Sequence, residues 1–295
     1  MLKLQGIFPA ITTPFDHKGE LYEIKVRHNV DKWNLTGLSG YVVCGTTGEA
    51  VNLSVDEKLH VFAWVAQQKG EGKILIAGTG CESVHQTVEL SNRAADLGYD
   101  AALVLTPSYY KKAVGTPEAQ LLFYRSVADR AKIPVLIYNI PQNTGVDIPV
   151  EVVAELSQHP NIAGIKESSG NVPKVARLVK ETKSGFQVLV GAASTLAESL
   201  SLGAAGGILA FANVAPYACI SIWEAYRTRE MDAAQDWQTR IEPAIQAVTS
   251  KYGIPGLKYA MDLNGYYGGA PRLPLTVVTP EVQQEIARAF DGIKG

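Results

Sequence analysis

The amino-acid sequence predicts an α/β protein, a (β/α)8 TIM barrel with a C-terminal helical extension. Eight short runs rich in Val, Ile and Leu recur between residues 7 and 212. Such runs are typical of strands buried on both faces, as parallel sheets require. Segments with helical spacing follow most of the runs, and parallel strands need such crossovers. Eight repeats of this kind fit one barrel.

The predicted strands are 7–13, 40–45, 74–80, 101–107, 135–141, 162–168, 186–191 and 206–212. The clearest helices are 54–69, 83–97, 149–157 and 172–183. Ser54 and Glu57 form a capping-box signature at the start of the first of these helices. A doubly wound open sheet is the alternative, but the segment PAITTPF after the first strand lacks the glycine fingerprint that this fold usually carries.

The rhythm changes after residue 228, so we expect a barrel over 1–228 and a helical extension of the same unit over 229–295. Pro243 should kink or restart the helix in which it lies. Residues 253–256, with the sequence GIPG, should form a break, and 265–274 a loop. Residues 280–293 should form a final helix.

The amino-acid composition excludes several classes of protein. Of 295 residues, 27 are Lys or Arg and 29 are Asp or Glu, and this balance argues against a general nucleic-acid or anionic-membrane binder. Three widely spaced cysteines make no disulfide or zinc framework and fit a reducing compartment. No apolar run reaches the ~18 residues of a membrane span. We expect a cytoplasmic protein without a metal or cofactor.

Lys166 is the most informative residue for chemistry. In a (β/α)8 barrel the active site lies at the carboxyl ends of the strands, and Lys166 ends the apolar run that begins at Ile162. Burial favours the free amine, which is a Schiff-base nucleophile toward a carbonyl substrate. The alternative is an ordinary lysine just outside the strand, solvated or paired with Glu167.

Two further segments point to the same end of the barrel. Tyr138 ends the neighbouring strand, where its hydroxyl could transfer protons near the amine, although a tyrosine in an apolar run is more commonly core packing. The loop GTTGE (45–49) offers the hydroxyls of Thr46 and Thr47 together with approachable backbone N–H groups. Such a loop suits a carboxylate or a phosphate.

The motifs GTTGE (45–49), TPSYY (106–110), YNIPQNTG (138–145) and GIKESSG (164–170) resemble the dihydrodipicolinate synthase / N-acetylneuraminate lyase family of class I pyruvate aldolases. The resemblance implies that Lys166 forms a Schiff base with pyruvate, that Tyr138 relays protons, and that Thr46 lies at the substrate carboxylate. It implies a homotetramer or homodimer in which Tyr109 of a partner subunit completes the relay. The residues expected to bind substrate are Thr47, Gly45, Asn143, Ser168 and Ile208.

Within this family, Asn143 stands where dihydrodipicolinate synthases carry an arginine, and several other segments look most like 4-hydroxy-2-oxoglutarate aldolase. We therefore expect cleavage of 4-hydroxy-2-oxoglutarate to pyruvate and glyoxylate. The alternative is the synthase reaction, 4-hydroxy-tetrahydrodipicolinate formation from pyruvate and aspartate semialdehyde, which the synthase-like GTTGE favours. Two alternatives from other classes are a phosphosugar-binding barrel that uses GAAST (191–195) and GAAGG (203–207), and a non-catalytic pyruvate-binding protein.

Overall fold

A computed structural model describes residues 2–293 and shows the predicted (β/α)8 barrel with C-terminal helices. Each of the eight predicted apolar runs overlaps one strand. The strands are β1 (Gly6–Pro9), β2 (Gly40–Val43), β3 (Ile74–Gly78), β4 (Ala101–Leu105), β5 (Val135–Asn139), β6 (Ile162–Glu167), β7 (Gln187–Val190) and β8 (Gly206–Leu209). They form one sheet in the order β1-β8-β7-β6-β5-β4-β3-β2, which is not the order of a doubly wound sheet.

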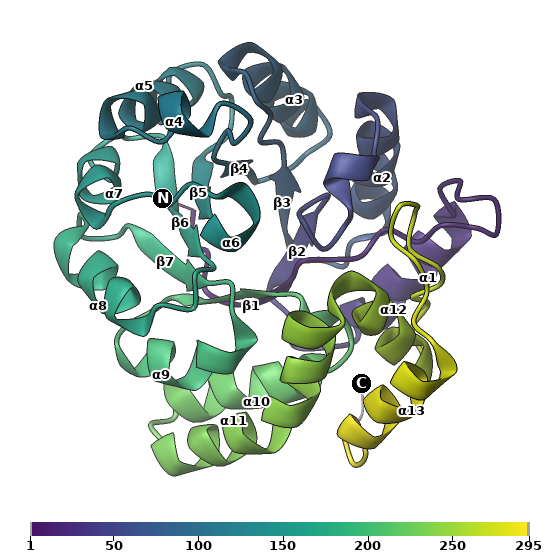
Figure 1. Ribbon diagram of the computed structural model, residues 1–295. Coiled ribbons are helices and arrows are strands. Elements are labelled where there is room, and N and C mark those ends of the chain that lie inside the picture. Colours follow the sequence, from purple (N-terminus) through teal and green to yellow (C-terminus); the bar gives the residue numbers. More distant parts are fainter. Residues whose placement is uncertain (1, 294–295) are drawn as a thin grey trace. The chain divides into compact units, whose positions relative to one another are not determined.

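The chain divides into two compact units. The first contains the residues up to Gln5 and Ile74–Ile208, and therefore strands β3 to β7 with most of β8. In Figure 1 its helices α5, α7 and α8 lie along the outside of β5, β6 and β7. The helices of this unit are α3 (Val84–Asp96), α4 (Lys111–Val114), α5 (Pro117–Ala128), α6 (Pro141–Thr144), α7 (Val150–Leu156), α8 (Val172–Glu181), the 3-10 turn η2 (Ala193–Thr195) and α9 (Leu196–Ser201).

The second unit contains Gly6–Lys73 and the residues from Leu209 onward. It holds β1, β2 and the C-terminal helices. Its helical elements are α1 (Glu23–Asn34), the 3-10 turn η1 (Ala50–Asn52), α2 (Val55–Gln68), the 3-10 turn η3 (Phe211–Asn213), α10 (Pro216–Arg227), α11 (Met231–Ile245), the π-helix η4 (Gln246–Lys251), α12 (Gly253–Leu263) and α13 (Pro280–Ala289).

Local sequence signals explain several helix ends. Ser54 and Glu57 make the predicted capping box at the start of α2. Pro149 precedes the first residue of α7 as its N-cap. The helix does not restart at Pro243, because α11 runs through this proline and continues into the π-helix η4. The expected break over 253–256 is wrong, since α12 begins at Gly253.

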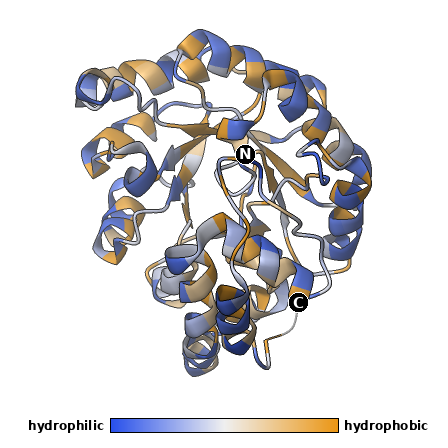
Figure 2. Cartoon of the chain, turned by 45° about the vertical axis from the view of Figure 1, so that its right-hand side comes forward, coloured by the Kyte–Doolittle hydropathy of each residue, from blue (hydrophilic) through white to orange (hydrophobic). Residues whose placement is uncertain are grey.

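The hydrophobic core is formed by the apolar strands and by the apolar faces of the helices that pack on them. In Figure 2 the strands are orange along most of their length, whereas the helices alternate between orange and blue stretches. Helices with one apolar stripe pack that stripe inward and leave the polar face in water. Among the described residues, no helix is long and apolar enough to cross a membrane.

Candidate active site

The ends of β5 and β6 bring Tyr138 and Lys166 together in the first unit. The register between these parallel strands shifts between Val135 and Leu136, so that Leu136 pairs with Gly164. Because of this irregularity Lys166 pairs with Tyr138; an unshifted register would pair it with Asn139. The Lys166 Nζ lies 4.1 Å from the centroid of the Tyr138 ring. The two side chains therefore lie in contact, with the amine over the face of the ring.

Burial makes this pair suited to covalent chemistry. Lys166 is 4% exposed and Tyr138 is 3% exposed. A lysine at such a position has little access to water, and a free amine there can attack a carbonyl carbon. The alternative, in which Lys166 pairs with Glu167, does not hold. The two residues are neighbours in a strand, and successive side chains of a strand point to opposite faces. The position at the carboxyl end of β6 is where barrel enzymes hold catalytic groups.

Glu167 belongs to a polar network on the other face of the same strand. Its Oε2 accepts a hydrogen bond from Asn139 Nδ2 at 2.9 Å and lies 3.4 Å from Lys174 Nζ in α8. Its Oε1 accepts from the backbone N–H of Ser169 at 2.7 Å. Lys174 also pairs with Asp147. The network fastens the ends of β5 and β6 directly behind the Tyr138–Lys166 pair.

Ser168 and Gly191 complete the surroundings of the lysine. Ser168 is 6% exposed, and its Oγ has no hydrogen-bond partner among the described residues. Unsatisfied buried hydroxyls are rare, and a bound ligand is one way to satisfy them. A Cβ on Gly191 would lie 1.7 Å from the Ser168 Oγ and 3.1 Å from Lys166 Cε, so only glycine leaves room for both side chains.

The GTTGE loop lies in the second unit, directly after β2. Gly45 and Thr47 are buried, and Thr46 is partly exposed. The backbone N–H of Gly48 donates to the Gly45 carbonyl at 3.1 Å, and that of Glu49 donates to the Thr46 carbonyl at 3.0 Å. A Cβ on Gly48 would lie 3.0 Å from the Ile11 carbonyl oxygen, which makes this glycine the tightly packed one.

Cys44, expected inside the strand, instead follows β2 in a left-handed conformation with φ of 55°. Burial raises the pKa of its thiol to about 12, so the thiol stays protonated near neutral pH. A protonated thiol is a poor nucleophile and a poor metal ligand. Among the described residues, no group of three or more His, Cys, Asp or Glu side chains could hold a metal ion.

The remaining predicted residues occupy different environments. Tyr109 is 79% exposed, and its backbone N–H donates to Glu82 at 3.0 Å. Asn143 lies in the short helix α6 and is exposed. Ile208 is fully buried in β8. In this single chain, the exposed Tyr109 does not share the buried environment of Lys166.

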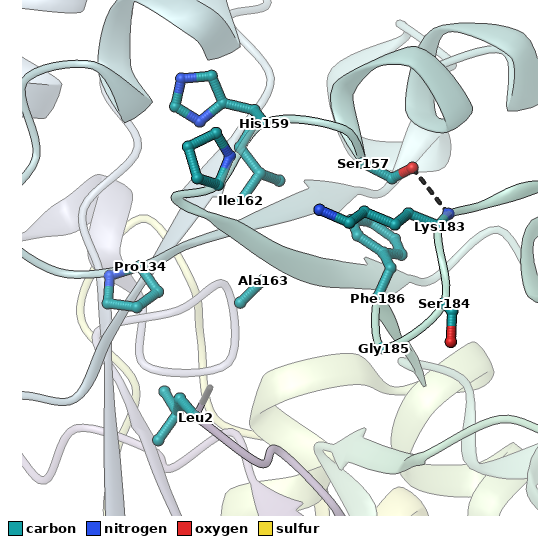
Figure 3. A pocket seen from close by; sticks show the side chains of 11 residues that line it. Leu2, Pro134, Ser157, His159, Ile162, Ala163, Lys183, Ser184, Gly185 and Phe186 are labelled. Carbon is teal, nitrogen blue, oxygen red and sulfur yellow. Dashed lines mark hydrogen bonds between the residues drawn. The ribbon is translucent and has the colours of Figure 1, made fainter.

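A cavity of about 110 Å³ lies at the opposite ends of the strands. Figure 3 shows it lined by Pro134 and Ile162, where β5 and β6 begin, and by Lys183 and Phe186 before β7. The backbone N–H of Lys183 donates to Ser157 Oγ at 2.9 Å. This end of a barrel serves stability rather than catalysis.

Sequence reasoning missed the groups that support the site. Asn139 and Lys174 contact Glu167 directly, and Asp147 contacts Asn139 and Lys174. Glu82 accepts hydrogen bonds from the backbone of the loop at Tyr109. The alternation of side chains along β6 is a signal that Glu167 points to the helices. No local pattern identifies its partners.

A buried lysine at the carboxyl end of the sixth strand places an amine that can form a Schiff base where barrel enzymes hold their catalytic groups. A family model described as the dihydrodipicolinate synthetase family matches residues 3–292. The chain belongs to this family. Members are lyases that form a Schiff base between a lysine and pyruvate, so this chain is an enzyme of that class.

Similar proteins cover almost the whole chain. A 4-hydroxy-tetrahydrodipicolinate synthase of Methanothrix thermoacetophila is 38% identical, over 96% of this chain and 94% of the relative. One of Cellvibrio japonicus is 34% identical, over 97% of this chain and 98% of the relative. A dihydrodipicolinate synthase structure from Bacillus anthracis has a TM-score of 0.94 at 26% identity, covering 100% of both chains.

A chloride-inhibited dihydrodipicolinate synthase from Acinetobacter baumannii, complexed with pyruvate, has a TM-score of 0.93 at 31% identity, over 98% of this chain and 99% of that chain. These relatives and structures bear the synthase name. They support the synthase alternative better than the expected 4-hydroxy-2-oxoglutarate aldolase.

Proposed function

We propose that Lys166 is the Schiff-base residue and that the enzyme condenses pyruvate with aspartate semialdehyde. The observation that carries the first part is the buried Lys166 amine over the Tyr138 ring at the end of β6. The names of the curated relatives, which cover nearly the whole chain, support the second part.

The chemistry begins with attack of the Lys166 amine on the carbonyl carbon of pyruvate. Loss of water gives an iminium, which withdraws electrons from the adjacent methyl carbon. Loss of a proton from that carbon gives an enamine, and its carbon attacks the aldehyde carbon of the second substrate. The Tyr138 hydroxyl carries protons to and from the amine and the leaving water. Hydrolysis or internal displacement then frees the lysine.

We assign the substrate carboxylate of pyruvate to the GTTGE loop, with Thr46 and Thr47 as hydrogen-bond donors and Gly45 providing space. We also assign Ser168 a hydrogen bond to the substrate, because its buried hydroxyl has no partner among the described residues. Ile208 contributes an apolar wall, and Tyr109 acts from a second subunit. These roles rest on the family resemblance and on the residue chemistry.

Cleavage of 4-hydroxy-2-oxoglutarate to pyruvate and glyoxylate is the second candidate. Asn143 favours it, because a neutral amide offers neither the charge nor the fork of an arginine to the carboxylate of aspartate semialdehyde. Loss of such a contact commonly costs ~1.5–3 kcal/mol, which is roughly ten- to a hundredfold in affinity.

Two measurements test this proposal. Borohydride reduction with pyruvate should add one reduced pyruvate to the peptide containing Lys166, and Lys166→Ala should abolish the addition. Addition that persists in the variant would show that another residue forms the Schiff base. Kinetics with both substrates should then give the higher kcat/KM for aspartate semialdehyde. The reverse order would assign the enzyme to the second candidate.

A further inference from the structure

The part of the second unit that begins at Leu209, called the C-terminal segment below, contacts the GTTGE loop through a buried ion pair. The Lys258 Nζ in α12 lies 2.6 Å from Glu49 Oε1, and both side chains are fully buried. The same amine donates to the carbonyl oxygens of Thr13, at 2.9 Å, and Ala270, at 3.3 Å. The ammonium therefore donates two hydrogen bonds to backbone carbonyls and forms an ion pair with the Glu49 carboxylate.

Arg272 holds the same carboxylate and the turn that follows it. Its backbone N–H donates to Glu49 Oε2 at 2.9 Å. Its guanidinium donates to the Asn52 carbonyl at 2.8 Å and pairs with Glu57 at 2.7 Å. Both oxygens of Glu49 are therefore bound by residues of the C-terminal segment, and η1 is held at its last residue.

Glu49 needs this support because of its backbone conformation. Its φ of 55° lies in the left-handed region, which is unfavourable for a non-glycine residue and persists only when the surroundings enforce it. Thr13 adds a further restraint, since its Oγ1 donates to the Gly48 carbonyl at 2.7 Å. The loop between β2 and η1 is thus shaped by partners that are distant in sequence.

Stability alone is a weak reason to bury these charges. Replacing a buried ion pair by apolar groups of similar volume is often neutral or stabilising, because both ions lose their hydration. Here burial lowers the pKa of Lys258, and the Glu49 charge opposes that shift. The pair restricts the direction of the Glu49 side chain, and the Glu49 backbone N–H donates to the Thr46 carbonyl at 3.0 Å. Through this bond a change at Glu49 reaches the threonines of the loop.

We propose that Lys258 and Arg272 are positioning residues for pyruvate binding, which they support by holding Glu49 and thereby setting the conformation of Thr46 and Thr47. This inference rests on the proposed role of these threonines at the pyruvate carboxylate. Loss of the contacts of Lys258 and Arg272 with Glu49 weakens pyruvate binding and leaves the chemical step at Lys166 nearly unchanged.

The test compares Lys258→Met with Lys251→Met. Lys251 also belongs to the C-terminal segment and also pairs with a glutamate at 2.6 Å, but its pair with Glu285 is solvent-exposed. The readouts are kcat, KM for pyruvate, and the pyruvate concentration that gives half-maximal borohydride trapping. Lys258→Met should raise the last two at least about tenfold with kcat within about threefold, and Lys251→Met should change none of them by more than about twofold.

Lys258→Met leaves a buried carboxylate unpaired and can fail to fold. The double variant Lys258→Met/Glu49→Gln removes that charge, and Thr13→Val removes only the hydroxyl that binds the Gly48 carbonyl. Both should fold, as judged by circular dichroism, and both should bind pyruvate more weakly. Half-maximal trapping at the wild-type concentration in the folded double variant, or a loss confined to kcat, would overturn the inference. Absence of trapping in the wild-type enzyme would instead overturn the proposed function.

Discussion

At the scale of single residues, the positions of Lys166 and Tyr138 have different structural causes. Lys166 is a candidate because it ends an apolar run, where burial is expected, and the structure confirms its burial. Tyr138 becomes its direct partner through the register irregularity at the start of β5 and β6. A tyrosine whose ring contacts the amine serves either as packing or as a proton carrier, and removal of its hydroxyl separates the two roles.

Tyr138→Phe should retain the fold and the ring contact with Lys166 and lose about 10²–10⁴-fold in turnover, the typical contribution of a proton-transferring side chain. Steady-state kinetics measures the effect, and the thermal unfolding midpoint serves as the control for folding. A variant with the turnover of the wild type would show that Tyr138 is only core packing.

At the scale of elements, β6 and α8 are joined behind the site by Glu167 and Lys174. Both side chains are buried, whereas Arg177 on the same helix forms exposed pairs with Glu151 and Glu181. Removing one partner of a buried pair leaves an uncompensated charge, while exposed pairs contribute little.

Lys174→Met should therefore lower the free energy of unfolding by ~3–5 kcal/mol, and Arg177→Met by less than about 1 kcal/mol. Urea denaturation of the two variants provides the comparison. Equal losses in both variants would contradict the argument that the buried network fastens β6 to α8.

At the scale of the whole molecule, the proposed role of Tyr109 requires a second subunit. Its side chain is 79% exposed in the single chain and contacts the equally exposed Tyr110 edge to face, with 5.1 Å between ring centroids. Two large aromatic rings left in water at one loop fit a surface that another subunit covers.

Mixing the inactive variants Tyr109→Phe and Lys166→Ala should restore part of the activity, because a hybrid dimer contains one site with both an intact lysine and an intact partner tyrosine. Native mass spectrometry would show whether hybrids form. Hybrids that form and remain inactive would contradict a role across subunits. Each variant mixed with itself is the control.

The sequence by itself determined where the strands lie and which of them carries Lys166 near its carboxyl end. It could do so because a strand buried on both faces requires a continuous apolar run, and the end of that run is visible in one segment. The capping box of α2 is equally local. A local signal can also be overridden by tertiary packing, and α11 continues through Pro243 without the restart that a proline can impose.

Only the tertiary structure decided the partners of the buried polar groups. Glu49 meets Lys258 and Arg272 across more than 200 residues of sequence. The pairing of Lys166 with Tyr138 instead of Asn139 depends on a one-residue register shift. Hydrophobic burial repeats with the period of an element, whereas a buried charge needs one particular partner at one particular distance. That partner can come from any part of the sequence that the fold brings close, and no periodic pattern in the sequence indicates it.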